Sequence, residues 1–292
     1  MASTSSGIGI ADRMPQKEPS PDELASSALT GIKQKFIVMS GKGGVGKTSV
    51  SVNLSIALAN KGFKVGLMDV DVHGPDIPRM LGLTGSLEID GERKLIPKKF
   101  SENLCAVSVE SLLGDKDGAV IWRGPMKHSA IRQFISEVTW GPLDCLIIDS
   151  PPGTGDEPLT IAQLIKDARA IIVTTPQEVA LADVRKSINF CKTVGMEVFG
   201  LIENMSGFEC PHCGEPIAFL GIGGGEKTAA HAGIPFLGRI PFDMHLVKCE
   251  DAGESYQNKF KFSAVTRAFD KVVAKITREI QQSNQMPKGE NA

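Results

Sequence analysis

The chain has 292 residues, of which 41% are hydrophobic, 23% are charged and only 5% are aromatic. Its 32 basic and 34 acidic residues give a formal net charge of −2, which provides no general electrostatic attraction to nucleic acid or to an anionic membrane. No apolar run reaches the roughly 18 residues that a transmembrane helix needs. We therefore expect neither a nucleic acid nor a membrane among the partners.

Residues 1–31 are polar and contain neither a basic start followed by an apolar segment nor a cysteine. A secretory leader would need the first of these features, so we interpret the segment as a disordered lead-in of a cytoplasmic protein. The six cysteines do not form a dense framework, which favours a reducing compartment. Residues 283–292 are predicted to be a polar tail.

Residues 32–282 are predicted to form a single domain. An apolar strand over 35–40 runs into a Gly-rich turn and a helical pattern, and a second strand follows at 64–70, which together make a βαβ unit. Further apolar runs predict strands at 104–110, 143–149, 169–175, 197–204 and 234–241. Because these runs are continuous rather than alternating, the prediction is an α/β fold with a doubly wound, mostly parallel sheet and helices on both faces.

Two segments depart from this alternation. Residues 84–103 are polar and rich in turn formers, so they are predicted to be a small excursion from the domain. Near the end of the chain, apolar residues recur at helical spacing and predict a terminal helix that packs on the sheet. They are Val265, Phe269, Val272, Val273, Ile276 and Ile280. A membrane-anchoring helix is disfavoured because the tail beyond it is polar and lacks aromatic residues.

The stretch "GKGGVGKT" (41–48) fits the pattern of a phosphate-binding loop, and it lies between a predicted strand and a predicted helix. Glycines let the backbone bring its N–H groups against phosphate oxygens, and the helix N-terminus favours an anion. Lys47 should reach the β- and γ-phosphates of ATP, and Thr48 should coordinate Mg²⁺. The predicted loop contacts are Gly41, Lys42, Gly43, Gly44, Val45, Gly46, Lys47, Thr48 and Ser49. The alternative is a purely structural Gly-rich turn.

A second lysine, Lys42, directly follows the first glycine of the loop. The loop thereby resembles the deviant Walker A motif of the SIMIBI-type ATPases, such as MinD, ParA and the nitrogenase iron protein. The resemblance implies that Lys42 crosses a dimer interface to the partner's nucleotide, and it gives both Lys42 and Lys47 a catalytic role. The alternative is a solvated surface lysine.

Carboxylates follow two of the predicted strands. Asp149 ends the strand "LDCLIID", the setting of a Walker B residue that holds Mg²⁺, although it could instead cap a helix. After it, Gly153 in "SPPGTGD" suits a switch loop that senses the γ-phosphate through a backbone N–H. The resemblance implies that Asp71, after the second strand, positions the attacking water and that Asp69 supports the metal.

Asn204 ends the predicted strand "EVFGLIEN". An amide can both donate to and accept from the edge of a base, and the resemblance implies that this side chain contacts the adenine. The alternative is an asparagine that caps a turn.

Cys210 and Cys213 form a C-x-x-C pair in "ECPHCGE". A thioredoxin-like dithiol should open a helix, which the nearby proline disfavours, and a zinc ribbon needs two such pairs. A second copy of the chain would supply four thiolates, enough for one [4Fe–4S] cluster or one tetrahedral metal. The other cysteines are interpreted as buried apolar residues in strands or a helix (Cys105, Cys145, Cys191), or as a loop residue without a specific role (Cys249).

Together, "GKGGVGKT", "DVDVHGPDIP", "DSPPGTGD", "TTPQEVALADVRK" and "ENMSGFECPHCG" resemble the Mrp/ApbC-type P-loop ATPases from about residue 30 onward. The resemblance implies a homodimer with slow ATP hydrolysis that holds a [4Fe–4S] cluster between its subunits and passes it to apo iron–sulfur proteins. Thiolates also suit zinc, so a zinc-stabilised regulatory ATPase is an alternative. A ParA/MinD-like positioning ATPase and a non-catalytic adaptor are two further alternatives.

Overall fold

The computed structural model describes residues 20–285 except 73, 92–93, 113–123 and 211. Its main sheet has eight strands in the order β12-β9-β8-β1-β7-β2-β6-β5. In chain order the bounds are β1 Ile32–Met39, β2 Val65–Asp69, β5 Lys98–Lys99, β6 Leu104–Ser108, β7 Leu143–Asp149, β8 Arg169–Thr174, β9 Val198–Glu203 and β12 Phe236–Arg239. The pairing is parallel throughout except between β5 and β6. The predicted doubly wound, mostly parallel sheet is confirmed.

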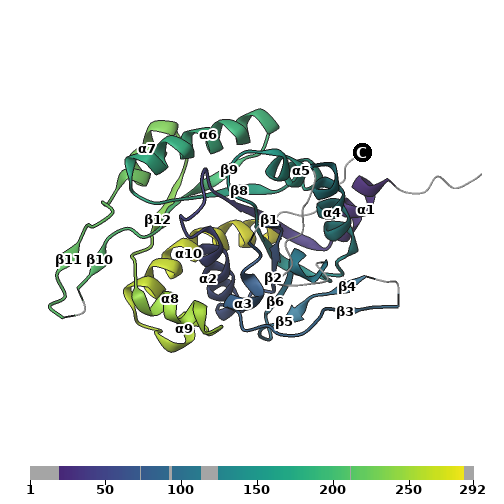
Figure 1. The fold of residues 1–292 in the computed structure, drawn as a ribbon, viewed down its shortest axis with the longest axis horizontal. Helices are drawn as coiled ribbons and strands as arrows, with labels where there is room; N and C mark the ends of the chain where they lie inside the picture. The colour runs from purple at the N-terminus through teal and green to yellow at the C-terminus, as the bar shows by residue number, and fades with distance from the viewer. Residues whose placement is uncertain (1–19, 73, 92–93, 113–123, 211, 286–292) are drawn as a thin grey trace, which may run out of the picture.

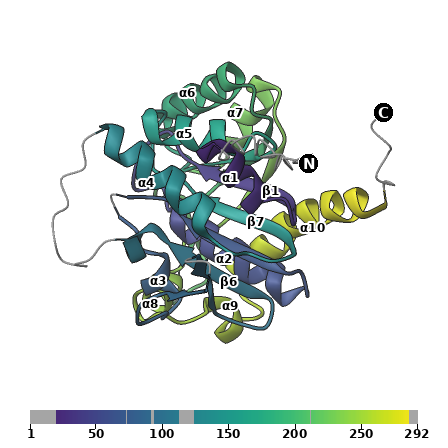
Figure 2. The ribbon, with the colours of Figure 1, turned by 90° about the vertical axis from the view of Figure 1, so that its right-hand side faces the viewer.

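Helices cover both faces of the sheet, as Figures 1 and 2 show. One face is covered by α2 Lys47–Asn60, α3 Ile77–Met80, α8 Met244–Asp251, α9 Tyr256–Lys259 and α10 Ala264–Gln285. The other is covered by α1 Pro21–Ala28, α4 Gly124–Glu137, α5 Asp156–Leu164, α6 Glu178–Val194 and α7 Gly224–Ala232. Each layer encloses its own apolar core, because the central strands are buried on both sides.

The terminal helix follows its sequence pattern, since all six of its predicted apolar residues are buried against the sheet. The excursion at 84–103 forms a two-stranded sheet from β3 Glu88–Ile89 and β4 Leu95–Ile96, and its end adds β5 to the main sheet. A short 3-10 helix, Val109–Leu112, follows β6. No helix in the described part of the chain is long and apolar enough to cross a membrane.

Three expectations need correction. The lead-in is not disordered throughout, because α1 forms with a capping box between Ser20 and Glu23 and buries Ala25 and Leu29 in the core. Residues 1–19 lie outside the described part. The terminal helix extends into the predicted tail, since α10 continues to Gln285, and residues 286–292 lie outside the described part. Cys249 is not in a loop but lies buried in α8.

A hairpin projects from the body of the molecule next to β12 (Figure 1). It consists of β10 Phe208–Glu209 and β11 Pro216–Ile217, which pair antiparallel. We call residues 208–217 the cysteine hairpin, because Cys210 and Cys213 lie in the turn between its two strands.

Candidate functional site

The predicted phosphate loop joins β1 to α2. Gly44 and Gly46 have φ angles of 76° and 78°, a left-handed conformation that glycine adopts without strain. The loop is also closely packed: a Cβ at Gly41 would lie 2.4 Å from the carbonyl oxygen of Asp183 in α6, and one at Gly46 would lie 2.3 Å from Nδ2 of Asn204. The glycines therefore serve both the turn and its contacts with neighbouring elements.

Asp149, at the end of β7, lies at the centre of a buried network. Its Oδ2 accepts hydrogen bonds from Nζ of Lys47 at 2.9 Å and from the hydroxyl of Thr48 at 2.7 Å. Its Oδ1 accepts one from Ser51 at 2.7 Å. These contacts bring together the three residues expected to bind phosphate and Mg²⁺. Carboxylate and hydroxyl oxygens suit Mg²⁺, so Thr48 and Asp149 fit that ion.

The two aspartates after β2 lie beside this network. Nζ of Lys47 is 3.7 Å from Oδ2 of Asp71. Asp69 pairs with Asp149 in the sheet register and is fully buried. Burial and the neighbouring Asp149 carboxylate raise the pKa of Asp69 well above its usual value. Asp69 accepts hydrogen bonds from the backbone N–H groups of Asp71 and Ile77, so it orders the segment that carries Asp71.

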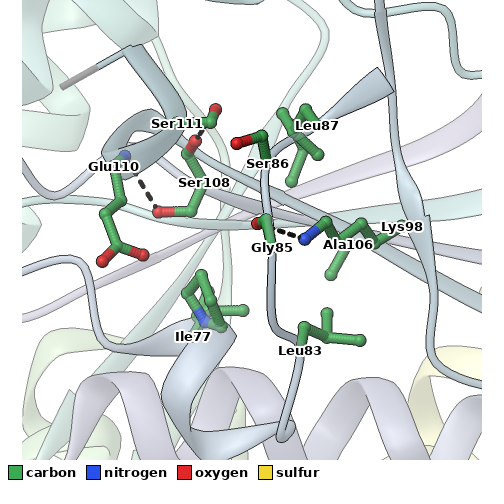
Figure 3. Close-up of a pocket in the computed structure, with 12 residues that line it drawn as sticks. Ile77, Leu83, Gly85, Ser86, Leu87, Lys98, Ala106, Ser108, Glu110 and Ser111 are labelled. Atoms are coloured by element: carbon green, nitrogen blue, oxygen red, sulfur yellow. Dashed lines mark hydrogen bonds between the residues drawn. The ribbon is translucent and has the colours of Figure 1, made fainter. Parts of the chain in front are cut away.

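A cavity of about 160 Å³ borders the end of this segment at Ile77 (Figure 3). It is lined in part by Ile77, Ser108 and Glu110, which come from α3, β6 and the 3-10 helix. The hydroxyl of Ser108 also donates to Asp69 at 3.2 Å. The cavity thus shares two residues with the hydrogen bonds that hold Asp69, and it is separate from the phosphate loop.

Other predicted residues take less central positions. The backbone N–H of Gly153 donates to the carbonyl oxygen of Ser40 at 2.8 Å, so the switch loop lies against the end of β1. Asn204 donates from its side chain to the carbonyl oxygen of Val45 at 2.9 Å. The structure gives the Lys42 ammonium no hydrogen bond or ion pair with any described residue.

Sequence reasoning missed several residues of this site. Ser51 lies one helical turn after Lys47, a spacing that could have indicated it. The hydroxyl of Ser49 donates to Glu250 in α8, which also accepts from Asn53 at 2.9 Å. Nothing in the local sequence links Glu250 to residues about 200 positions earlier, because only the fold brings α8 against α2.

The cysteine hairpin, β10 and β11 with the turn between them, projects from the body of the molecule (Figure 1). Cys213 is exposed and Cys210 is half-buried. The turn is closed by a hydrogen bond from the backbone N–H of Gly214 to the carbonyl oxygen of Cys210 at 2.8 Å. The backbone N–H groups of Cys213 and His212 lower the pKa of the Cys210 thiol, which favours the thiolate form that binds metals.

An aromatic cluster supports the base of the hairpin. The rings of Phe208, Phe219 and Phe242 pack edge to face, with centroids 5.7 to 6.4 Å apart. Phe219 nevertheless remains exposed, as do Ile217 and Ile222. Within the described residues of one chain, no group of three or more His, Cys, Asp and Glu side chains is arranged to hold a metal ion.

The other cysteines differ in burial. Cys145 and Cys191 are fully buried, as expected, and Cys105 is half-buried in β6. Burial raises the pKa of Cys105 to about 11 and that of Cys191 to about 12. These two thiols are therefore held in the protonated form.

The relatives found by comparison with known proteins agree with one another in the names they carry. A family model described as ParA, NUBPL iron-transfer P-loop NTPase, matches residues 31–277. An iron-sulfur cluster carrier protein from Methanocaldococcus jannaschii is 47% identical over 84% of this chain and 88% of its own length. The cytosolic Fe-S cluster assembly factor CFD1 from Saccharomyces cerevisiae is 42% identical over 88% of this chain and 91% of its own.

Solved structures agree with this fold. A nucleotide-binding protein from Archaeoglobus fulgidus, in complex with ADP, has a TM-score of 0.70 at 40% identity and covers 80% of this chain and 91% of its own. The cell division ATPase MinD from Pyrococcus furiosus has a TM-score of 0.62 at 22% identity, over 85% of this chain and 99% of its own. The second likeness concerns the fold alone.

Proposed function

The chain belongs to the NUBPL iron-transfer P-loop NTPase family, and on that basis we propose that it is an ATP-dependent iron–sulfur cluster carrier. The observation that carries the proposal is the pair of thiols at the turn of a projecting hairpin, one of them with a lowered pKa. The relatives named as cluster carrier and cluster assembly factor support the same cargo. The protein would act in the cytosol, since its relative CFD1 is named a cytosolic Fe-S cluster assembly factor.

The cluster would be shared between two copies of the chain. Cys210 and Cys213 supply two of the four thiolates that a [4Fe–4S] cluster takes, and a two-fold axis through the hairpin would supply the rest. The exposed apolar residues around the hairpin (Ile217, Phe219 and Ile222) would pack in that interface. Thiolates on an exposed turn can exchange their metal readily, which suits transfer to apo iron–sulfur proteins.

The nucleotide site would use the buried network. Lys47 and the loop amides would bind the phosphates of ATP, and Asn204 would contact the adenine. Thr48 and Asp149 would hold Mg²⁺, which neutralises phosphate charge when bound. Asp71 would orient the attacking water, and Lys42 would reach across to the partner's nucleotide. Hydrolysis would be slow and would depend on dimer formation.

A direct test is anaerobic reconstitution with iron and sulfide, followed by metal and sulfide analysis and a visible absorption spectrum. The wild-type protein should bind iron and sulfide, whereas C210A and C213A should bind neither and still bind ATP. C105A is the matched control, because Cys105 lies in β6 outside the hairpin, and it should bind as the wild type does. Full iron and sulfide content in both hairpin variants would refute the bridging site.

Two further outcomes separate the alternatives. If the anaerobically purified protein contains zinc and no sulfide, that content would support the zinc-stabilised regulatory ATPase instead. Sedimentation of the cluster-loaded protein with ATP should give a dimer, and a single chain under these conditions would refute the shared cluster.

A further inference from the structure

Glu203 is a fully buried carboxylate at the end of β9, one residue before Asn204. It accepts hydrogen bonds from the hydroxyl of Ser206 at 2.5 Å and from the backbone N–H groups of Gly223 at 2.8 Å and Gly225 at 2.5 Å. Nε of Arg239 lies 3.8 Å from the same carboxylate. An ionised carboxylate is costly to bury unless hydrogen bonds satisfy it, so the three hydrogen bonds from Ser206, Gly223 and Gly225 define the position of this side chain.

The glycines belong to "GIGGGEKT" (221–228), which is similar in composition to the phosphate loop "GKGGVGKT". Like that loop, it opens a helix, and Gly221 and Gly223 have φ angles of 89° and 85°. Amides at such a helix start favour an anion. Here the anion is the Glu203 side chain, so the turn is occupied from within the chain and is not a second nucleotide site.

These hydrogen bonds join the two segments that flank the cysteine hairpin, which we call its ends. Ser206 lies two residues before β10, and Gly223 lies a few residues after β11. The first end is also joined to the segment after β12, since the backbone N–H of Ser206 donates to Ile240 and that of Phe242 donates to Gly207. The Glu203 carboxylate is therefore a shared attachment point for the two ends of the hairpin.

The neighbouring residue faces the nucleotide loop. Asn204 donates to the carbonyl oxygen of Val45, and it closely approaches Gly46. A continuous path of covalent and hydrogen bonds thus runs from the phosphate loop through Asn204 and Glu203 to the hairpin. A shift of the loop against Asn204 would be transmitted to the positions of Cys210 and Cys213.

We propose that Glu203 is a positioning residue that couples the nucleotide state of the phosphate loop to the geometry of the cysteine pair. The inference rests on the proposed function for the roles of the two sites. Its test uses the protein without any cluster, so the two can fail independently.

The test measures how fast a maleimide labels Cys210 and Cys213, by mass spectrometry, with and without Mg²⁺ and ATP. In the wild-type protein ATP should change the labelling rate about fivefold or more, the range of ordinary coupling between sites. Glu203→Gln keeps the side-chain volume, but its NH₂ group is a donor and cannot accept the hydrogen bonds that the backbone N–H groups of Gly223 and Gly225 donate. It should lose most of this change while ATP affinity stays at the wild-type level.

Glu226→Gln is the matched control. Glu226 lies in the first turn of α7, pairs with Arg239 and carries the same charge, but its side chain is exposed and does not bond to the hairpin. It should respond to ATP as the wild type does. If Glu203→Gln fails to fold by circular dichroism, Ser206→Ala decides the question, since it removes only the hydroxyl bond to one end of the hairpin and should weaken the response.

The proposal would be overturned if ATP left the labelling rates of Cys210 and Cys213 unchanged in the wild-type protein. An unchanged response in Glu203→Gln, or in Ser206→Ala if Glu203→Gln is unfolded, would overturn it too. If the protein instead binds no iron or sulfide, while ATP still changes the labelling rate in the wild type and not in Glu203→Gln, that result would support the coupling and refute the proposed cargo. A protein that binds the cluster, but in which ATP does not change the labelling rate of the hairpin cysteines, would refute the coupling and leave the proposed function standing.

Discussion

The hydroxyl of Thr48 donates a hydrogen bond of 2.7 Å to Oδ2 of Asp149, across the junction between α2 and β7. Lys47 donates to the same oxygen, and the carboxylate is fully buried. The side chains expected to bind Mg²⁺ and the phosphates are thus held in one network by the fold itself. This arrangement limits how much they must reorganise when a nucleotide binds.

Replacing Asp149 with Asn should therefore separate nucleotide binding from hydrolysis. We expect D149N to reduce Mg²⁺-dependent phosphate release by about 100-fold or more, because the charge opposite Lys47 and Thr48 is lost. ATP binding measured in EDTA should persist. D144N, on the same strand but paired with the surface residue Lys33, should hydrolyse ATP as the wild type does. An equal loss of phosphate release in D149N and D144N would contradict the assignment of Asp149 to the Mg²⁺ site.

Lys42 gives a second prediction, since its ammonium makes no hydrogen bond or ion pair with the described residues of its own chain. K42A should bind ATP with wild-type affinity and hydrolyse it about 10-fold or more slowly, because the partner's nucleotide loses one cation. K61A removes a lysine at the far end of α2, where it pairs with Asp270, and should leave the rate unchanged. Wild-type turnover in K42A would count against a role across the interface.

The sequence was sufficient to predict the sheet, because long apolar runs with Gly-rich turns between them have few other interpretations. It also predicted that Lys47, Thr48 and Asp149 converge, since a phosphate loop and a strand end have fixed places in such a fold. It failed where a residue's environment depends on tertiary contacts. α1 is a short helix in which Ala25 is buried while Leu24 stays exposed, and Cys249 is buried where α8 packs against α3 and α9.

The same limit applies to the site. The contact between Ser49 and Glu250, and the carboxylate of Glu203 at the start of α7, join segments that no local pattern relates. The spacing of Ser51 from Lys47 was a usable signal, because residues four apart lie on one helix face. Roles that depend on a second chain or on a bound nucleotide, such as those of Lys42 and Gly153, stay predictions.

Two glycines of the phosphate loop should respond differently to substitution by alanine. A Cβ at Gly41 would meet the backbone of Asp183, which cannot move independently of α6, so G41A should destabilise the fold by about 1–3 kcal/mol. A Cβ at Gly43 has nothing within 4 Å, so G43A should unfold at the same urea concentration as the wild type. Any loss of ATP affinity in G43A would then come from contact between the new methyl group and the bound phosphates. Equal stability of G41A and the wild type would refute the packing argument.

Glu250 should make stability depend on pH. Burial raises its pKa from 4.5 to about 7, although the hydrogen bonds from Ser49 and Asn53 act in the opposite direction. Between these two values the folded protein holds a proton that the unfolded chain has released. The free energy of unfolding should therefore fall as the pH rises from about 4.5 to about 7 and should level off above that.

E250Q tests this dependence, because Gln cannot titrate but its Oε1 can still accept from Ser49 and Asn53. The stability of E250Q relative to the wild type should rise between about pH 5 and about pH 8, as measured by urea unfolding at both values. A group with a lowered pKa would give the opposite sign, since its charged form would stabilise the fold at high pH. A relative stability that falls with pH would thus show that Glu250 is held as a favourable charge beside α2.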